Sequence, residues 1–410
     1  MSSHGPSADD LVCDPSHRFC VSKSVNIDEA IQDLLKRVKA RDPHEKEFLQ
    51  ALEEVIVSLK PVLTQHPYYI DVLETLAEPE QVHYFRVPWI DDNGRQQVNR
   101  GFRVQYSSAL GPFKGGLRFH PSVNLSVVKF LGFEQIFKNS LTGLPLGGGK
   151  GGSDFDPKNK SDGEVLRFCQ SFITSLFHHI GPSQDIPAGD IGVGSREIGY
   201  MYGMYKRLTR QFEGTMTGKN TKWGGSYLRT EATGYGVVYF TDHVMADLDT
   251  SLEGKTCLIS GSGNVAQYCC EKLLQGGAKV VTMSDSSGYI HVPSGMTKEM
   301  LQELFDLKQR RRGRISEMAD KFDQIKFFKG KKPWEVAADV ALPCATQNEV
   351  TEEDAQTLVK NGLVALVEGA NMPCTSQAVK RIESAGVAFG PAKAANAGGV
   401  AVSGLEMAQN

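Results

Sequence analysis

A glycine motif in the second half of the chain limits the folds that are open to it. An apolar run over residues 255–260 is followed at once by Gly261-Ser-Gly-Asn-Val-Ala266, which opens a helical stretch to Gln275. A second apolar run, residues 279–283, then leads to Asp285. This order of strand, glycine turn, helix, strand and acid is the context in which such a motif binds a dinucleotide. The sequence therefore predicts a βαβ unit with a phosphate site at the start of its helix.

Each small residue of this motif has a separate physical task. Gly261 makes the tight turn, Gly263 lets a pyrophosphate approach the backbone, and Ala266 lets the helix pack closely on the strand. Backbone amides at the helix start would hold the phosphates. The predicted phosphate-binding residues are Gly261, Ser262, Gly263, Asn264 and Val265.

The pattern on either side of the motif predicts two α/β domains with a cleft between them. Candidate strands at residues 340–342, 363–367 and 387–389 alternate with helical stretches, which indicates a doubly wound parallel sheet of the Rossmann type. Before the motif, amphipathic helices precede strands that alternate with period two. We expect the domain boundary between residues 235 and 236, so that the domains span 25–235 and 236–410.

Composition excludes several classes of protein. A net charge of −3 over 410 residues argues against nucleic acid as the main partner. No apolar run approaches the roughly 18 residues that a membrane span needs. Residues 1–24 are acidic and lack the apolar core of a secretory signal, which predicts a disordered extension. The eight cysteines are scattered without a CxxC pair, which favours free thiols in the cytoplasm and no metal site.

A second glycine cluster, Leu146-Gly-Gly-Gly-Lys-Gly-Gly152, surrounds a single lysine. Glycine carries an entropic cost, so a cluster of this kind indicates a sharp bend or a close approach to another group. A P-loop is excluded by spacing, because Leu144 stands where glycine is needed and Gly151 where serine or threonine is needed. The remaining interpretations are a flexible loop and a loop that presents Lys150 to a small ligand.

Other charged residues in the first half suit the second interpretation. Lys114 lies in another predicted glycine-flanked loop, and Asp190 lies in an acidic, glycine-rich one. A predicted helix over residues 127–141 places Gln135 and Lys138 on one face, three residues apart. Each lysine alone would be an ordinary solvated side chain. Together they predict an anion site, since lysine suits a carboxylate as a compact point charge.

The residues alone leave the choice of cofactor open. Asp285 after the second strand favours a free ribose 2′-hydroxyl and hence NAD. A basic run farther along would close over a 2′-phosphate, as in NADP, or would form a solvated helix face. The run consists of Lys308, Arg310, Arg311, Arg312 and Arg314.

From about Val25 to its end the chain resembles the hexameric bacterial and fungal glutamate dehydrogenases of the Glu/Leu/Phe/Val dehydrogenase family. The resemblance rests on several independent motifs in the same order. They are Lys114–Ser122, Gly132–Lys138, Leu146–Gly152, Pro187–Gly192, Gly261–Ala266, Gly369–Pro373 and Lys393–Gly399.

The resemblance implies reversible oxidative deamination of L-glutamate to 2-oxoglutarate and ammonium. Lys150 and Asp190 match the catalytic residues. The matches for substrate binding are Lys114 and Ser403 at the side-chain carboxylate, Gln135 and Lys138 at the α-carboxylate, and the Gly189 carbonyl near the amino group.

The resemblance also implies a homohexamer and a set of cofactor-binding residues. Ser286, Lys308 and Arg311 are similar to residues of the NADP-preferring members, which favours NADP, with NAD as the alternative. The remaining matches, beside Asp285 and the glycine motif, are Thr233, Asn371 and Asn396, the last near the nicotinamide. A nucleotide-binding or regulatory subunit without turnover is the alternative from another class.

Physical chemistry supports this assignment. Glutamate has two carboxylates and one ammonium, so its site needs cations at two ends and an acid near the nitrogen. Nearby positive charges and removal from water should lower the pKa of Lys150 and let it act as a base, with Asp190 binding the ammonium and transferring its proton. Lys114 decides the substrate, because an apolar side chain would leave it buried without a counter-charge. The family's further C-terminal helices are expected to be missing after Asn410.

Overall fold

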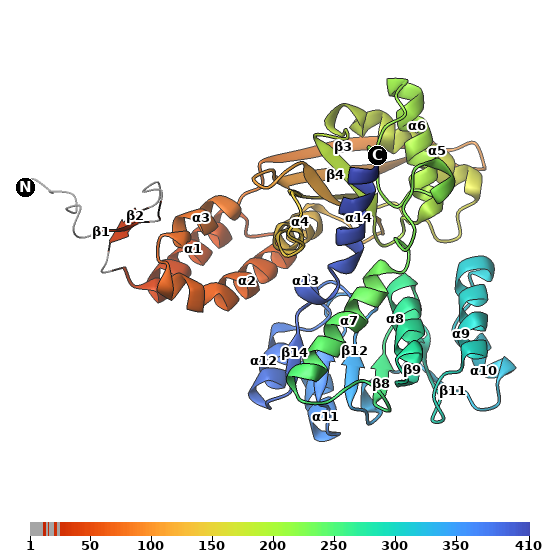
Figure 1. Cartoon of the computed structure of the whole chain (residues 1–410). Helices are drawn as coiled ribbons and strands as arrows, with labels where there is room; N and C mark the ends of the chain where they lie inside the picture. The colour runs from red at the N-terminus through yellow and green to blue at the C-terminus, as the bar shows by residue number, and fades with distance from the viewer. Residues whose placement is uncertain (1–10, 14, 16–19, 23–24) are drawn as a thin grey trace, which may run out of the picture. The chain divides into compact units, whose positions relative to one another are not determined.

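The computed structural model describes residues 11–13, 15, 20–22 and 25–410 of the chain. The chain folds into two compact units, and Figure 1 labels most of their helices and strands. The first unit ends at Gly224 and also includes Asn410, and the second runs from Gly225 to Gln409. The domain boundary expected from the sequence, between residues 235 and 236, stays a prediction.

Three helices precede the large sheet of the first unit, and they include the two amphipathic stretches expected there. Asn26 caps the first of them by accepting hydrogen bonds from the amides of the first turn. Apolar residues at helical spacing are buried on one side of the first two helices, and α2 packs against α4. The helices are α1 (Ile27–Arg41), α2 (Lys46–Gln65) and α3 (Tyr69–Leu76).

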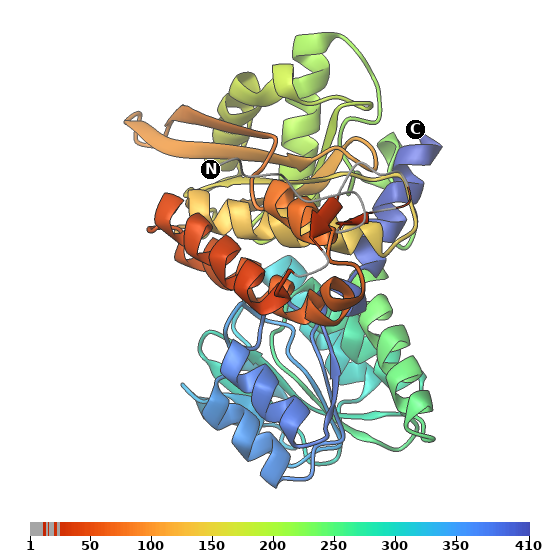
Figure 2. The same ribbon diagram turned by 90° about the vertical axis from the view of Figure 1, so that its left-hand side faces the viewer.

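A mixed five-stranded sheet forms the centre of the first unit, in the order β3-β4-β6-β5-β7. The β3–β4 hairpin predicted from the alternating pattern is present, and β5 runs parallel to both β6 and β7. Helix α4 covers one face of the sheet, while α5 and α6 cover the other (Figure 2). The bounds are β3 (Gln81–Ile90), β4 (Gln96–Ser107), β5 (Phe113–Phe119), β6 (Gly148–Ser153), β7 (Asp185–Gly189), α4 (Leu125–Ser140), α5 (Asp162–Leu176), η2 (Phe177–His179), α6 (Ser195–Thr209) and η3 (Thr221–Trp223).

The glycine-rich segments around Lys114 and Lys150 are strands β5 and β6, so the prediction that they are loops was wrong. Close contact between neighbouring strands requires the glycines. A Cβ atom added at Gly115 would lie 1.7 Å from the carbonyl oxygen of Gly149. At Gly152, where φ is +157°, it would lie 2.2 Å from the carbonyl oxygen of Arg118. Glycine here allows tight strand packing rather than flexibility.

A seven-stranded sheet forms the second unit, in the order β11-β10-β9-β8-β12-β13-β14. Its strands β9, β8, β12, β13 and β14 are parallel, which confirms the predicted doubly wound sheet, whereas β10 and β11 extend one edge in antiparallel fashion. The bounds are β8 (Thr256–Ile259), β9 (Lys279–Asp285), β10 (Gly288–His291), β11 (Lys326–Lys329), β12 (Val340–Leu342), β13 (Ala365–Val367) and β14 (Ala388–Gly390).

Helices cover both faces of this sheet because successive strand residues point to opposite sides. Cys257 and Ile259 of β8 belong to one apolar core, and Leu258 between them belongs to the other. The helices of this unit are α7 (Ala232–Asp247), α8 (Asn264–Gln275), α9 (Lys298–Phe305), η4 (Asp306–Arg311), α10 (Glu317–Lys321), η5 (Pro333–Glu335), α11 (Glu352–Lys360), α12 (Ser376–Ser384), α13 (Ala392–Ala395) and α14 (Gly398–Gln409).

Part of the N-terminal extension is ordered as a small antiparallel sheet of β1 (Leu11–Cys13) and β2 (Cys20–Ser22). Its register places Cys13 opposite Cys20, and the two form a disulfide, so the expectation of free thiols was wrong for this pair. The other six cysteines are free and buried. The rest of the predicted disordered extension, residues 1–10, 14, 16–19 and 23–24, lies outside the described residues. Within the described part of the chain, every helix is too short or too polar to cross a membrane.

Candidate active site

Three adjacent strands of the first unit bring together residues that are far apart in the sequence. Lys114 lies on β5, Lys150 on β6, and Asp190 directly follows β7. The Lys150 ammonium lies 3.2 Å from Asp190 Oδ1, and both side chains are almost fully buried. The two predicted catalytic residues therefore form a pair inside the unit.

A second cation, Arg118, binds the same carboxylate and was missed by the sequence analysis. Its Nε lies 2.6 Å from Asp190 Oδ2, and its side chain is 3% exposed. Arg118 belongs to the motif that contains Lys114 and lies four residues farther along the same strand, where alternate residues share a face. That spacing was the available signal, but it has meaning only once the segment is known to be a strand.

The charges around this pair change how readily both groups take up a proton. Burial raises the pKa of the Asp190 carboxyl, but Arg118 and Lys150 outweigh it and hold that pKa below its ordinary value. Burial lowers the pKa of Lys150, and the positive charges of Arg118 and Arg103 lower it further against the opposing effect of Asp190. The pKa of Lys150 changes in the direction predicted, but the cations that lower it most are arginines rather than lysines.

A fully buried ion pair between Arg103 on β4 and Asp185 on β7 lies in the same sheet and was also not predicted. Arg103 Nε donates to Asp185 Oδ2 at 2.8 Å, and Gln105 Nε2 donates to the same oxygen at 2.9 Å. Arg103 also bonds the carbonyl of Gly115 on β5, at 3.2 Å. These bonds hold the strands around Lys150 in one register, since a buried charge that loses its partner destabilises a fold by several kcal/mol.

The predicted substrate-binding residues of the first unit lie on β5, α4 and β7. Lys114 is buried, and its Nζ donates to the Ile186 carbonyl at 3.1 Å and to Thr217 Oγ1 at 2.8 Å. On α4, Gln135 donates to Asn139 at 2.7 Å, and Asn139 in turn bonds the backbone carbonyl of Lys114 at 3.1 Å. Asn139 thus ties the helix to β5. Lys138 is half-buried on α4, and Gly189 is the last residue of β7.

The predicted dinucleotide loop of the second unit connects β8 to α8. Gly261 adopts φ of +82°, and its amide donates to Ser284 Oγ at 2.8 Å. Ser262 is buried, and Asn264 and Val265 are the first residues of α8. A Cβ added at Gly263 would meet no described atom within 4 Å, so the start of α8 borders open space. A helix of 12 residues whose first amides have no side-chain cap suits an anion.

The carboxylate of Asp285, at the end of β9, accepts hydrogen bonds from residues around it in the second unit. Its Oδ1 accepts from the Ser287 amide at 2.8 Å, and its Oδ2 accepts from the Ile315 amide at 2.9 Å and from Lys308 Nζ at 3.4 Å. Burial raises the pKa of Asp285, but these bonds outweigh it and lower that pKa. With both oxygens engaged, the carboxylate is a poor partner for a ribose hydroxyl.

Two arginines of the predicted basic run have different partners. Arg314 Nη1 donates to Ser286 Oγ at 2.8 Å, which places this arginine beside the Asp285 loop. Arg311, the residue selected from the sequence, instead pairs with Glu303 and, at 2.8 Å, with Asp306. The structure therefore brings Arg314 to Ser286, and it ties Arg311 to the acids of α9 and η4.

The remaining predicted residues of the second unit lie near its C-terminus or on α7. Asn396 Nδ2 donates to the Gly369 carbonyl at 3.0 Å and to Asn371 Oδ1 at 3.2 Å, while its own Oδ1 is buried without a partner among the described residues. The hydroxyl of Ser403 on α14 donates a hydrogen bond to the Gly399 carbonyl at 3.0 Å and accepts one from Arg229 Nε. Thr233 packs on Gly399, where an added Cβ would lie 2.1 Å from its Oγ1.

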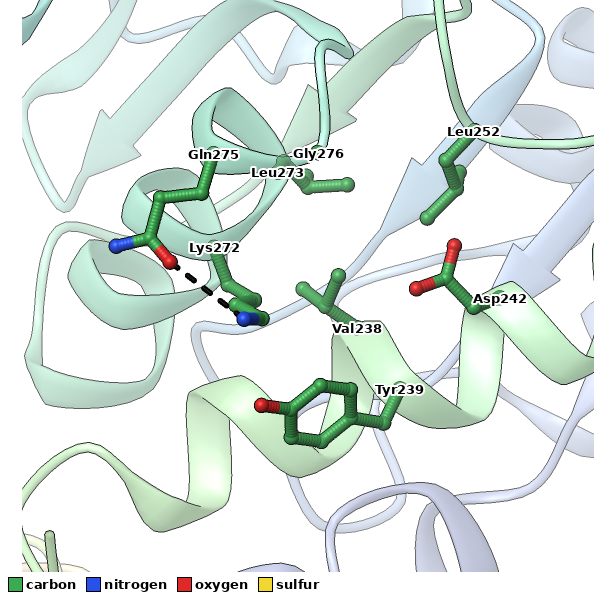
Figure 3. Close-up of a pocket in the computed structure, with 8 residues that line it drawn as sticks. All are labelled: Val238, Tyr239, Asp242, Leu252, Lys272, Leu273, Gln275 and Gly276. Carbon is green, nitrogen blue, oxygen red and sulfur yellow. Dashed lines mark hydrogen bonds between the residues drawn. The ribbon is translucent and has the colours of Figure 1, made fainter.

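A pocket on the second unit contains none of the predicted residues (Figure 3). It has a volume of about 220 Å³ and lies between α7 and α8. Its charged groups are Asp242 and Lys272, and Lys272 bonds Gln275 and lies 4.9 Å from the ring centre of Tyr239. The candidate active site and the dinucleotide loop are elsewhere.

Comparison with known proteins gives matches over nearly the whole chain. Residues 79–207 match the family model of the Glu/Leu/Phe/Val dehydrogenase dimerisation domain, and residues 224–410 match that of Glutamate/Leucine/Phenylalanine/Valine dehydrogenase. The NADP-specific glutamate dehydrogenase of Giardia intestinalis is 61% identical over 385 residues, which are 93% of this chain and 86% of that protein. The enzyme of the same name from Escherichia coli is 55% identical, with the same coverage of both chains.

Solved structures agree with these matches. The crystal structure of Plasmodium falciparum glutamate dehydrogenase superimposes with a TM-score of 0.94 at 56% identity, covering 97% of this chain and 87% of that one. A hetero-hexameric glutamate dehydrogenase from Thermus thermophilus superimposes with a TM-score of 0.75 at 25% identity, covering 83% and 78%.

Proposed function

Because this chain belongs to the Glu/Leu/Phe/Val dehydrogenase family, we propose that it is an NADP-dependent glutamate dehydrogenase. It converts L-glutamate reversibly into 2-oxoglutarate and ammonium. The observation that carries this proposal is the buried group of Lys150, Asp190 and Arg118, in which an amine of lowered pKa lies next to a permanent carboxylate. A protein that only binds nucleotides has no need for such a pair.

Lys150 and Asp190 have separate tasks in the reaction. Neutral Lys150 takes a proton from the water molecule that attacks the iminium carbon, and returns one to nitrogen when the carbinolamine collapses. Asp190 accepts a hydrogen bond from the substrate ammonium. It also takes the proton that the nitrogen loses before the hydride leaves, which is the transfer expected from the sequence, and the neighbouring cations keep the carboxylate ionised until the substrate arrives.

The other substrate-binding residues complement the charges of glutamate. Lys114 would bind the side-chain carboxylate together with Ser403, and Gln135 and Lys138 would bind the α-carboxylate. The Gly189 carbonyl would accept from the amino group. Burial of Lys114 supports its part, since a buried ammonium favours an anionic partner.

The second unit would hold the cofactor, with Thr233 and the loop from Gly261 to Val265 at its dinucleotide. When bound, the nicotinamide supplies the hydride acceptor or donor. Three features fit NADP: the open space at Gly263, the Asn396 Oδ1 that has no partner among the described residues, and the cations Arg314 and Lys308 around a loop whose acid is already engaged. A 2′-phosphate suits such cations, whereas NAD needs a free carboxylate. Arg311 can bind the cofactor as predicted only if its ion pairs with Glu303 and Asp306 are broken.

The proposal extends to assembly and location. An apolar row on the edge strand β3 and its neighbour β4 is exposed, with Tyr84 at 65%, Ile90 at 53% and Val98 at 58%. An exposed apolar row marks an interaction surface, which supports a homohexamer in which another copy covers the row and the first unit provides both substrate binding and assembly. Cys13 and Cys20 form a disulfide, but the other six of the eight cysteines are buried free thiols, and this predominance supports a cytoplasmic protein.

A direct spectrophotometric assay tests the function. The purified protein is mixed with 2-oxoglutarate, ammonium and either NADPH or NADH, and the loss of nicotinamide absorbance is followed. We expect rapid loss with NADPH and much slower loss with NADH. Equal rates would refute the assignment of NADP, and a folded protein that consumes neither would refute the enzyme.

Arg118→Leu tests the electrostatic origin of the Lys150 pKa. Loss of this cation should raise the pKa of Lys150, so the pH below which kcat/KM declines should move upward. Arg118→Lys should partly restore the original profile. The control is Arg100→Leu, which breaks an exposed arginine–aspartate pair with Asp154 on the same sheet. An unchanged pH profile in Arg118→Leu would mean that the arginine only supports the fold.

A further inference from the structure

The second unit buries a carboxyl group that the proposed chemistry does not use. Glu368 directly follows β13 and is 6% exposed. Its Oε1 accepts from the Cys374 amide at 3.2 Å, and its Oε2 accepts from the Ala392 amide at 2.9 Å. The two amides belong to different segments, residues 369–374 and α13. One carboxylate therefore holds two segments that are not adjacent in the sequence.

Each of these segments carries one of the asparagines assigned to the cofactor. Asn371 lies in the first segment. Asn396 follows α13, and its amide donates to the Ala392 carbonyl at 3.0 Å. The side chains of the two asparagines meet at 3.2 Å. The position of Asn396 thus depends on how α13 is held against residues 369–374, and Glu368 is the group that bonds both.

Asn396 Oδ1 is the atom of this arrangement that is left to accept a further hydrogen bond. The side-chain nitrogen of Asn396 is used by the carbonyls of Gly369 and Ala370 and by Asn371. Its oxygen is buried without a partner among the described residues. A buried acceptor of this kind needs a donor, and the NH₂ of a carboxamide supplies one.

We propose that Glu368 is a positioning residue for the nicotinamide end of the cofactor. By accepting the amides of Cys374 and Ala392 together, it places Asn396 Oδ1 to receive a hydrogen bond from the nicotinamide carboxamide. This inference rests on the proposed NADP-dependent function. Other residues bind the adenine and phosphate end of the cofactor. Binding at the two ends can therefore be measured separately.

Replacing the carboxylate by an amide keeps the shape of the side chain but removes one acceptor oxygen. Glutamine matches glutamate in shape but has one acceptor oxygen, and its NH₂ would face a backbone N–H. Glu368→Gln therefore holds only one of the two segments. Loss of a hydrogen bond to a charged acceptor corresponds to roughly a tenfold or larger change in an equilibrium.

The test compares two ligands by calorimetry on the whole protein. NADPH contains the nicotinamide, and 2′-phospho-ADP-ribose contains everything else. We expect Glu368→Gln to weaken NADPH roughly tenfold while the fragment binds as before. Equal weakening of both ligands would show a merely structural role, and no weakening of either would also overturn the proposal. Turnover by the wild-type protein tests the proposed function separately, since both affinities can be measured without it.

Two further variants sharpen the test, and the first of them does not depend on how well Glu368→Gln folds. Ala392→Pro removes the amide that Oε2 accepts at the first position of α13, where proline is tolerated. The preceding Pro391 already has φ of −70° and ψ of 143°, which suits a residue before proline. This variant should weaken NADPH selectively as well. In an Asn396→Ala background, Glu368→Gln should cause no further loss, and an additive loss would contradict action through Asn396.

The matched control is Glu349→Gln, which changes a partly buried carboxyl group in the second unit. Glu349 Oε1 accepts from the amides of Ala345 and Thr346, at 2.9 and 3.3 Å. Burial raises the pKa of Glu349 to about 7, as it does for Glu368. Glu349→Gln should lower the melting temperature without changing the ratio of the two affinities. A change in that ratio equal to that of Glu368→Gln would remove the specific role.

A pH series gives an independent readout. The charged and titratable groups that face Glu368 are Lys393 on α13 and Cys374 in the neighbouring segment. As the pH falls through about 7, Glu368 takes up a proton and loses an acceptor, so the NADPH affinity should fall relative to that of the fragment. The 2′-phosphate is common to both ligands and cancels in the ratio. In Glu368→Gln this ratio should not depend on pH, and a persisting dependence would assign it to another group.

Discussion

Replacement of Lys150 by alanine is expected to abolish turnover while NADPH binds as tightly as before. The amine is the only group assigned to move a proton at the reacting carbon, and general acid–base catalysis contributes roughly a hundredfold to ten-thousandfold in rate. The cofactor loop lies in the second unit, which the substitution leaves intact. Steady-state kinetics with 2-oxoglutarate, ammonium and NADPH measure the rate, and calorimetry measures the affinity.

Lys158→Ala is the control for this experiment, because Lys158 is an exposed lysine a few residues farther along the chain. It should retain normal turnover. The wild-type protein should lose activity as the pH falls through the folded pKa of Lys150, since the protonated amine no longer accepts a proton. A Lys150→Ala protein that keeps substantial turnover would remove Lys150 from the proposed role.

Lys114→Leu is expected to reduce kcat/KM for 2-oxoglutarate roughly a hundredfold or more, because it removes the buried cation assigned to the distal carboxylate. A 2-oxo acid of the same length without that carboxylate should lose far less. The ratio of the two kcat/KM values measures specificity and is independent of a general loss of active protein. An unchanged ratio would contradict the assignment of Lys114.

Thr217→Val separates the charge of Lys114 from its support. It removes the hydroxyl that Lys114 Nζ bonds at 2.8 Å but leaves the ammonium and its bond to Ile186 in place. We expect a modest loss of stability, on the order of 1–3 kcal/mol, with specificity for the dicarboxylate preserved. If Thr217→Val and Lys114→Leu change specificity equally, the position of the lysine rather than its charge is decisive.

The second unit was predictable because its signals are local. The turn at Gly261, the start of α8 and the acid at the end of β9 lie within one βαβ segment. Residues close together in this segment are also close in space, so their spacing along the chain is enough to predict the site. The same reasoning missed the antiparallel strands β10 and β11, which extend one edge of the sheet. Their short length and weak apolar pattern give little to distinguish them from loops.

The first unit was harder to predict because its site is built across strands. The glycine clusters around Lys114 and Lys150 were interpreted as loops, since glycine is unfavourable in a strand unless another backbone lies close. That neighbouring backbone, such as Gly149 against Gly115, comes from a distant part of the chain. Without it, nothing indicated that Arg118 and Lys114 share one strand.

The sequence by itself determined the fold class, the dinucleotide loop and the identity of Lys150, Asp190 and Lys114 as candidates, because each rests on residue type and local spacing. Only the tertiary structure decided what acts on them. Burial and the charges of Arg118 and Arg103 set the proton affinity of Lys150, Arg314 rather than Arg311 lies at Ser286, and Glu368 joins two segments that carry asparagines. Electrostatic effects and hydrogen bonds depend on distance through space, which the order of residues along a chain does not contain.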